Sequence, residues 1–378
     1  MVRFGIEEEF MTLDPRTLAP IPQGAAARTA LARDRLQSAN GQRPAGDVQK
    51  EFLDCQVEIA TAPSQTLEEA GAQLARYRAQ LRDFGRRAGL IVASAGTPYG
   101  IAANASVTDT QRYRMIADFL GGLTREHLVN GLHVHTEVIG VEEQVSALNA
   151  VRPWLPVLLA ATANAPFWRG QDSGFASWRS MLLRRLPTMW CPPVFQDAQD
   201  YQHRVERLVT LGAALDPASI AWAARVSDTY DTVEVRVFDA QLTVADSLFT
   251  AALTRAIITD RPRTVALDSE AIDASLWMAA RGGMRARVVD PITGDVSPVP
   301  AVLQALCETV RNALEGHGDL EFARSRIERA QAEGSGADRQ RRAVASGGAL
   351  GLAGLLVDLD NEPPAPRETD LVRAPAPG

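Results

Sequence analysis

The segment Gly5–Phe10, with the sequence Gly-Ile-Glu-Glu-Glu-Phe, restricts most strongly how this chain can fold. Apolar residues surround it in the pattern of a β-strand. Side chains of a strand alternate between its two faces, so Glu7 and Glu9 share one face and Glu8 points to the other. Two carboxylates about 4 Å apart repel each other by roughly 4 kcal/mol at an effective dielectric near 20. The segment therefore predicts either a site for a divalent cation, which takes carboxylate oxygens, or a solvated acidic edge strand.

Two later segments, 50–61 and 131–138, show the same alternation of apolar and polar residues, which predicts further strands. Their polar faces carry Gln56 and Glu58 in the first segment and His133, His135 and Glu137 in the second. Imidazole and carboxylate groups on one face suit a divalent metal or a phosphate-handling site. One histidine alone would more often be structural, but two with a glutamate favour a site.

The segment 232–239 predicts a fourth such strand, with its valines on one face and Glu234, Arg236 and Phe238 on the other. Here a carboxylate that can bind a metal lies beside a fixed cation. Arginine offers a planar fork for phosphate oxygens, so this pairing suits phosphoryl chemistry. The alternative is an exposed strand decorated with charges.

Helical patterns lie between these strands. The clearest is 66–88, where Thr66 and Glu69 form a capping box and Gly89 supplies the stop. A short apolar strand is expected at 90–93, broken helices over 141–212, an amphipathic helix over 245–258 and another helix over 300–315. No linker is evident, so residues 1–362 are predicted to form one catalytic domain. The Pro- and Ala-rich tail, 363–378, is predicted to be disordered.

Composition excludes several classes of protein. The net charge of -7 and the pI near 5.4 leave no basic surface for nucleic acid. The three cysteines are scattered without the spacing of a metal site or a disulfide framework, which indicates a reducing compartment. The apolar region 147–168 is interrupted by prolines and an arginine, so no membrane span is expected. A cytoplasmic protein is the prediction.

If the four strands are neighbours in one sheet with helices on one side, their polar faces form a funnel of acids with two imidazoles and an arginine. Two or more divalent ions would stabilise so much negative charge. The chain has no P-loop and no Gly-rich dinucleotide motif. A metal-lined sheet can instead hold ATP by its phosphates.

Together these motifs resemble the glutamate–cysteine ligase type 2 family of carboxylate–amine ligases, whose catalytic fold is similar to that of glutamine synthetase. Each motif alone is weak, but the motifs occur in the family's order from residue 3 to about residue 360. The segments that carry the resemblance are 5–10, Gln56–Thr61, Gly131–His135, Pro166–Gly174, Thr232–Asp239 and Ala251–Leu253.

The resemblance implies an α+β, glutamine-synthetase-like fold in which an antiparallel sheet forms a metal-lined funnel with helices packed on its outer face. It also implies ATP and Mg²⁺ or Mn²⁺ as cofactors. The metal ligands would be Glu7, Glu9, Glu58, His133 and Glu234, the residues that the alternation of faces had already selected.

The reaction implied is the phosphorylation of a carboxylate by ATP, followed by attack of an amine to give an amide. Arg236 would lie on the transferred phosphate, and Arg225 or Arg179 would grip the substrate carboxylate. Nucleotide binding is assigned to Arg236, His135 and Arg169, the last in a loop that could close over a substrate. The expected partners are a small-molecule carboxylate and an amine, glutamate with cysteine being the family's best-known pair. Family members commonly form homo-oligomers.

The chain departs from the family pattern at several positions where a substrate would be held. These are Thr136, Glu137, the segment 188–193, Ala223 and Asp231. The changes predict intact metal and ATP machinery with an altered acceptor pocket. Two rival activities remain open, a phosphotransferase on the same fold acting on a guanidine group and a metal-dependent hydrolase. A non-catalytic binding protein is disfavoured, because it would not need so many like charges in one place.

Overall fold

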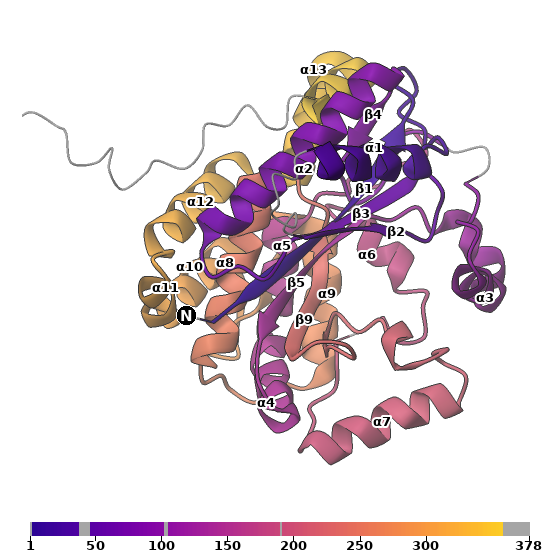
Figure 1. Ribbon diagram of the computed structural model, residues 1–378. Helices are drawn as coiled ribbons and strands as arrows, with labels where there is room; N and C mark the ends of the chain where they lie inside the picture. The colour runs from indigo at the N-terminus through magenta and orange to yellow at the C-terminus, as the bar shows by residue number, and fades with distance from the viewer. Residues whose placement is uncertain (1, 38–45, 102–104, 190, 358–378) are drawn as a thin grey trace, which may run out of the picture.

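Seven strands form one antiparallel sheet through the centre of the structure (Figure 1). The computed structural model describes residues 2–37, 46–101, 105–189 and 191–357 of the chain. The strands lie in the order β2-β3-β1-β5-β9-β8, and β4 pairs with β1. Their bounds are β1 Phe4–Leu13, β2 Asp47–Lys50, β3 Gln56–Ala60, β4 Ile91–Ala93, β5 Gly131–Glu137, β8 Ala224–Val226 and β9 Thr232–Asp239. Two small hairpins lie apart from this sheet, β6 Phe167–Trp168 with β7 Gln171–Asp172, and β10 Arg287–Val289 with β11 Val296–Pro298.

Helices cover one face of the sheet, which confirms the predicted α+β class. Figure 1 shows α2, α8, α10, α11 and α12 on one side of the strands and α3 and α7 on the other. The bounds are α1 Gly24–Gln37, α2 Leu67–Ala88, α3 Gln111–Leu120, α4 Val141–Val151, α5 Leu155–Thr162, α6 Trp178–Leu183, α7 Ala198–Thr210, α8 Val244–Asp260, α9 Ser269–Gly282, α10 Val299–Thr309, α11 Arg311–His317, α12 Leu320–Glu333 and α13 Gly336–Val357. Short 3-10 turns are η1 Gly121–Glu126, η2 Arg152–Trp154, η3 Pro217–Ser219 and η4 Gly283–Arg285. None of the helices in the described ranges is both long and apolar enough to cross a membrane.

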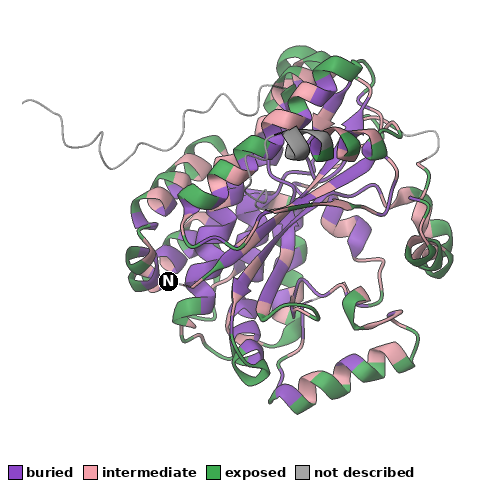
Figure 2. Ribbon diagram, viewed as in Figure 1, coloured by how far each residue is buried: buried purple, intermediate pink, exposed green. Residues whose placement is uncertain are grey.

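The core lies between the sheet and these helices. The apolar half of each strand's alternation is buried there, as at Ile6, Ile59, Val134 and Val235. Buried residues follow the strands and the helix faces that pack on them (Figure 2). The opposite face of the sheet is therefore left to the polar half of the alternation.

The helix predictions are confirmed in part. Helix α2 begins after Thr66 with the predicted capping box and ends at Gly89, whose φ of 68° needs the left-handed region that glycine tolerates. Helix α8 was predicted to be amphipathic, which is wrong, because it is buried on nearly all sides between the sheet, α2, α4, α11 and α12. The helix predicted over 300–315 is two helices, α10 and α11. The predicted tail, 363–378, lies outside the described residues.

The middle acid of the Glu-Glu-Glu run is buried on the helix side of the sheet. Glu8 accepts two hydrogen bonds from Arg78 of α2, from Nη2 at 2.8 Å and from Nε at 3.0 Å. The hydroxyl of Ser247, on α8, also donates to Glu8. This pair fastens the strand that carries Glu7 and Glu9 to the helices behind it.

Replacing Arg78 with methionine is expected to lower the free energy of unfolding by about 3–5 kcal/mol, because Glu8 would be left as an uncompensated buried charge. Urea denaturation followed by circular dichroism measures the change. Arg76→Met is the matched control, since Arg76 lies on the exposed side of the same helix and is expected to change stability by no more than about 0.5 kcal/mol. Equal losses in the two variants would contradict the role given to the buried pair.

A β-bulge in β9 corrects one prediction about faces. The register runs from Val134 opposite Val235 to Leu132 opposite Phe238, so two residues of β9 oppose one residue of β5. Beyond the bulge the alternation is inverted. Phe238 therefore lies in the core rather than on the polar face, and Asp239 lies on the polar face instead.

Candidate functional site

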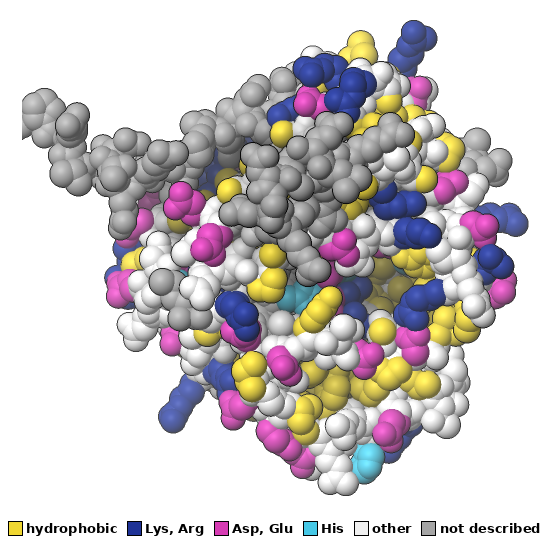
Figure 3. Space-filling view, in the orientation of Figure 1, with side chains coloured by type: hydrophobic (Ala, Val, Ile, Leu, Met, Phe, Trp, Pro, Cys, Tyr) yellow, Lys and Arg dark blue, Asp and Glu magenta, His cyan; other side chains and the backbone are white. Residues whose placement is uncertain are grey.

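The polar residues predicted on four strands meet on one face of the sheet, because the strands that carry them are neighbours. Pairing places Glu9 opposite Glu58, Glu7 opposite His133, and His135 opposite Glu234. The space-filling view shows a histidine side chain at the centre of this side of the molecule, with arginine or lysine side chains near it (Figure 3). Residues separated by more than two hundred positions thus form one continuous polar surface.

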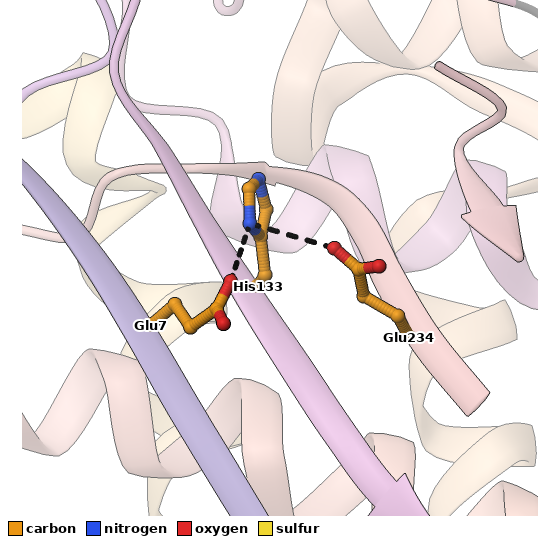
Figure 4. A group of neighbouring side chains, drawn as sticks. All are labelled: Glu7, His133 and Glu234. Carbon is orange, nitrogen blue, oxygen red and sulfur yellow. Dashed lines mark hydrogen bonds and ion pairs between the residues drawn. The ribbon is translucent and has the colours of Figure 1, made fainter. Parts of the chain in front are cut away.

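Glu7, His133 and Glu234 form a first ligand group, hereafter the first group. One donor atom from each lies within 4.8 Å of the others. Nδ1 of His133 lies 3.1 Å from Oε2 of Glu7 and 3.6 Å from Oε1 of Glu234, and the two carboxylates reach toward the ring from the neighbouring strands (Figure 4). Two carboxylate oxygens and one imidazole nitrogen in this arrangement fit a divalent cation.

The carboxylates of the first group are held in their ionised form. Burial alone would raise the pKa of Glu7, but hydrogen bonds from His133 and His135 hold it well below the ordinary value. Burial would likewise raise the pKa of Glu234, but the charges of Arg236 and Arg225 bring it far below the usual range. Both carboxylates are therefore ionised at neutral pH and can bind a cation.

Glu9, Glu51 and Glu58 form a second group, again with one oxygen from each within 4.8 Å of the others. Here burial, followed by the charges of Glu51 and Glu7, raises the pKa of Glu58 well above its ordinary value. Burial and the charge of Glu51 raise the pKa of Glu9 as well. Two buried acids with raised pKa values beside a third carboxylate are a favourable place for a second cation, because its charge would offset their mutual repulsion.

Glu51 was not among the metal ligands predicted from the sequence. The strand predicted over 50–61 begins later, as β3 Gln56–Ala60, and the residues before it form the turn of a hairpin in which β2 pairs with β3 and Lys50 lies opposite Val57. Glu51 is the first residue after β2, so the turn brings it beside Glu58. The only signal in the sequence was an acid at the start of that polar segment.

Two arginines hold Glu234 in place. Arg236 contacts Oε1, and Nε of Arg225 donates to Oε2 at 2.7 Å. Arg236 also lies 3.5 Å from Nδ1 of His133. Arg225 donates further to the carbonyl oxygens of Ala218 and Ile220. Arg225 was predicted as a candidate for gripping a substrate carboxylate, and its described contacts are with the Glu234 carboxylate and these two carbonyl groups.

Arg179 is buried beside the second group and keeps donors unused. Its Nη2 donates to the carbonyl oxygen of Arg236 at 3.4 Å, and Nη1 lies 3.8 Å from Oδ1 of Asp239. Nε and Nη1 have no hydrogen-bond partner among the described residues. Burial raises the pKa of Asp239 to about 6 despite the guanidinium nearby. Buried donors without hydrogen-bond partners are costly, so a ligand that accepts hydrogen bonds from Nε and Nη1 would stabilise Arg179.

The two other residues predicted to bind nucleotide are in different situations. Nε2 of His135 lies 3.4 Å from Oε1 of Glu7, and Nδ1 lies 2.9 Å from Oγ1 of Thr232, so His135 borders the first group. Arg169 is exposed, pairs with Glu126 at 2.6 Å and lies over the ring of Trp168. In the described part of the chain it contacts no member of either ligand group.

Most of the sequence departures at 136–137 and 188–193 for which contacts are described have structural partners, although Oγ1 of Thr136 has no hydrogen-bond partner among the described residues. Thr136 is fully buried, and Glu137 pairs with Arg3 at an exposed edge. Oγ1 of Thr188 accepts the backbone N–H of Ala221, and the N–H of Cys191 donates to Asp273. Thr136 thus lies on the core side of β5, as its alternation predicts, and Glu137 is held by Arg3 at the end of the strand.

Comparison with known proteins agrees with this geometry. The sequence model described as glutamate–cysteine ligase family 2 matches residues 3–354. A protein of Saccharopolyspora erythraea with the provisional name glutamate–cysteine ligase 2-1 is 38% identical over 343 residues, 89% of this chain and 88% of that protein. One of Nocardia farcinica with the same provisional name is 38% identical over 346 residues, 90% of this chain and 88% of that protein.

Solved structures share the fold at low sequence identity. The glutamate–cysteine ligase of Francisella tularensis, solved in complex with AMP, matches with a TM-score of 0.68 at 11% identity, over 95% of this chain and 87% of that one. A bifunctional glutathione synthetase from Pasteurella multocida matches with a TM-score of 0.68 at 14% identity, over 94% of this chain and 51% of that one. At these identities the structural likeness shows the fold alone.

Proposed function

The chain belongs to glutamate–cysteine ligase family 2 and is an ATP-dependent carboxylate–amine ligase, and we propose that the polar face of its sheet is the catalytic site. The observation that carries the proposal is the pair of adjacent ligand groups bordered by Arg236 and Arg179. Residues 1–362 are proposed to act as one catalytic domain, which the family match over 3–354 supports.

Mg²⁺ or Mn²⁺ suits both groups, because their donors are carboxylate oxygens and one imidazole nitrogen. Glu7, His133 and Glu234 would hold one cation, and Glu9, Glu51 and Glu58 a second. When bound, the cations would neutralise the phosphates of ATP and the charge that develops during transfer. The raised pKa of Glu58 and the orphaned donors of Arg179 both support a site that is complete only with ligands.

ATP is proposed to lie over the first group, since that group has the positive side chains. Arg236 reaches Glu234 and His133, so its guanidinium can contact oxygens of the transferred phosphoryl group. Arg225 keeps the Glu234 carboxylate in position from the other side. The γ-phosphoryl group passes to a substrate carboxylate, which gives an acyl phosphate and ADP. The amine then attacks the acyl carbon, and phosphate leaves as the amide forms.

The substrate carboxylate is proposed to bind near the second group through Arg179, whose Nε and Nη1 have no hydrogen-bond partner among the described residues. The relatives' names favour glutamate as the acid and cysteine as the amine donor. We propose small molecules for both substrates.

A screen for ADP release tests the activity. The protein is incubated with ATP and Mg²⁺ or Mn²⁺ and with amino acids singly and in pairs, and mass spectrometry identifies the product. ADP formation that needs both an acid and an amine, with an amide as the product, is the expected result. A stable phosphorylated product made without an amine would instead show a phosphotransferase, and cleavage without nucleotide would show a hydrolase.

Cation binding at the second group is expected to weaken as the pH falls. Glu58 and Glu9 have raised pKa values, so they retain protons at a pH where an ordinary glutamate has lost them. A cation must displace these protons, so binding releases protons and its apparent affinity rises with pH. Calorimetric titration with Mn²⁺, in buffers of different ionisation heat between about pH 5 and pH 8, counts the protons released.

The variant Glu51→Gln serves as the comparison for this titration. It removes the charge that helps to raise both pKa values, so fewer protons should be released, and the loss of an oxygen ligand should weaken binding. Cation binding that is independent of pH and releases no protons would contradict the assignment of the second group.

A further inference from the structure

An exposed aromatic ring stands at the border of the first group. Tyr230 exposes 60% of its surface. Its ring centroid lies 6.1 Å from that of His135, with the two planes at 87°. His135 in turn lies 3.4 Å from the Glu7 carboxylate. One side chain therefore separates this ring from a proposed metal ligand.

The turn that carries Tyr230 is held by its own hydrogen bonds. Oγ of Ser227 accepts the backbone N–H groups of Thr229 at 3.3 Å and Tyr230 at 3.2 Å. The N–H of Ser227 donates to the carbonyl oxygen of Thr232 at 3.0 Å. The N–H of Thr232 donates to the carbonyl oxygen of Tyr230 at 2.7 Å. The backbone of the turn is thus held by four hydrogen bonds, while the Tyr230 side chain is exposed. Single exposed aromatic residues are common on protein surfaces, so only the position of Tyr230 beside the first group suggests a function for it.

Among the described residues, the aromatic ring of Tyr113 near the second group is not comparable to that of Tyr230. Tyr113 lies near the second group, where partial burial, followed by the charges of Glu51 and Glu58, raises the pKa of its phenol. Its hydroxyl donates to the carbonyl oxygen of Lys50 at 2.7 Å, and its ring packs edge-on against Phe52 with centroids 5.9 Å apart. Tyr113 is therefore already committed to the fold, whereas the Tyr230 ring has a free surface.

The distribution of charge between the first and second groups determines the orientation in which a nucleotide can bind. The first group has Arg236, Arg225 and two imidazoles around its carboxylates, so a polyphosphate is favoured there. The second group is three mutually repelling acids. With the terminal phosphate between the two groups, the nucleoside must extend away from the acids. This direction follows β9 from Glu234 to its first residue, Thr232, which is about 7 Å away along the strand. Tyr230 lies in the turn just before Thr232.

We propose that Tyr230 is a nucleotide-binding residue whose ring stacks on the base of ATP. The inference rests on the proposed function, because it takes the position of the phosphates from it. Stacking uses the π-face that every base has, so Tyr230 contributes affinity without selecting strongly between adenine and guanine. It contributes nothing to the binding of a polyphosphate without a base.

The test compares ATP with inorganic tripolyphosphate, each titrated calorimetrically with Mg²⁺ present. Tyr230→Ala is expected to raise the Kd of ATP about tenfold and leave that of tripolyphosphate unchanged. The kcat at saturating ATP should also stay unchanged, so that the effect is confined to KM. Tyr230→Phe keeps the ring and should bind ATP like the unaltered protein. Thr229→Ala, an exposed residue of the same turn, controls for disturbance of the backbone.

Equal weakening of ATP and tripolyphosphate by Tyr230→Ala would overturn the inference, because the ring would then act on the phosphate site. Unchanged ATP binding would also overturn it, and either result leaves the proposed function intact. If the unaltered protein binds neither ATP nor tripolyphosphate, the proposed function fails and this inference fails with it.

Discussion

Replacing Glu234 with glutamine is expected to abolish metal-dependent ADP formation, with a fall in kcat of about 10³-fold or more. Glu234 belongs to the first group and receives Arg225 and Arg236 on its two oxygens. The amide has nearly the same shape but no charge, so it binds a cation poorly and no longer offsets two guanidinium groups. Because the amide oxygen can still accept a hydrogen bond, the fold should persist.

Three measurements separate loss of chemistry from loss of structure. Circular dichroism and thermal unfolding check that Glu234→Gln is folded, and Mn²⁺ titration shows whether a binding site has been lost. Glu137→Gln is the matched control, because Glu137 lies on the neighbouring strand β5 and pairs only with Arg3 among the described contacts. It should retain full activity. Full activity in Glu234→Gln itself would refute the first group as the catalytic metal site.

Replacing Arg236 with alanine is expected to slow the chemical step by about 10²- to 10³-fold while the Kd of ATP changes only a few-fold. Arg236 lies between Glu234 and His133, where the transferred phosphoryl group is proposed to pass. Its interaction grows as charge spreads over the equatorial oxygens, so the loss appears mainly in the transition state. Single-turnover formation of ADP measures the step, and calorimetry measures ATP binding.

Arg225→Ala is the informative comparison. Arg225 contacts the other oxygen of Glu234 and two backbone carbonyl groups. It is expected to act by orienting a metal ligand, with a loss of about 10- to 100-fold that is accompanied by weaker cation binding. Arg236→Lys should recover part of the rate, since it restores the charge but not the fork. A single-turnover rate unchanged in Arg236→Ala would count against a role in phosphoryl transfer.

The alternation of side chains along strands made most of the candidate site predictable. Glu7, Glu9, Glu58, His133 and Glu234 could be chosen because each lies on the polar face of a strand whose other face is apolar. That rule is local, and the neighbouring strands then bring the residues together. The resemblance to the family added the antiparallel pairing and the reaction, which alternation alone does not specify.

The errors have a common physical origin, which is a partner or a backbone irregularity that no local pattern records. Glu8 was expected only to point away, but its partner Arg78 lies 70 positions later and both are buried. Glu51 joins the second group through a turn that was read as part of a strand. The bulge puts Phe238 on the core face, and the prediction was wrong because no glycine or other residue near Phe238 marks the bulge in the sequence.

The same irregularity determines which changes in length β9 can accept. Deleting Val237 would leave Glu234, Arg236 and Asp239 on one face and Phe238 on the other, because regular alternation would replace the bulge. Deleting Val235 would instead put Glu234 and Arg236 on opposite faces and divide the pair. Homologues that differ by one residue here can therefore keep the same chemistry only if the gap falls within the bulge.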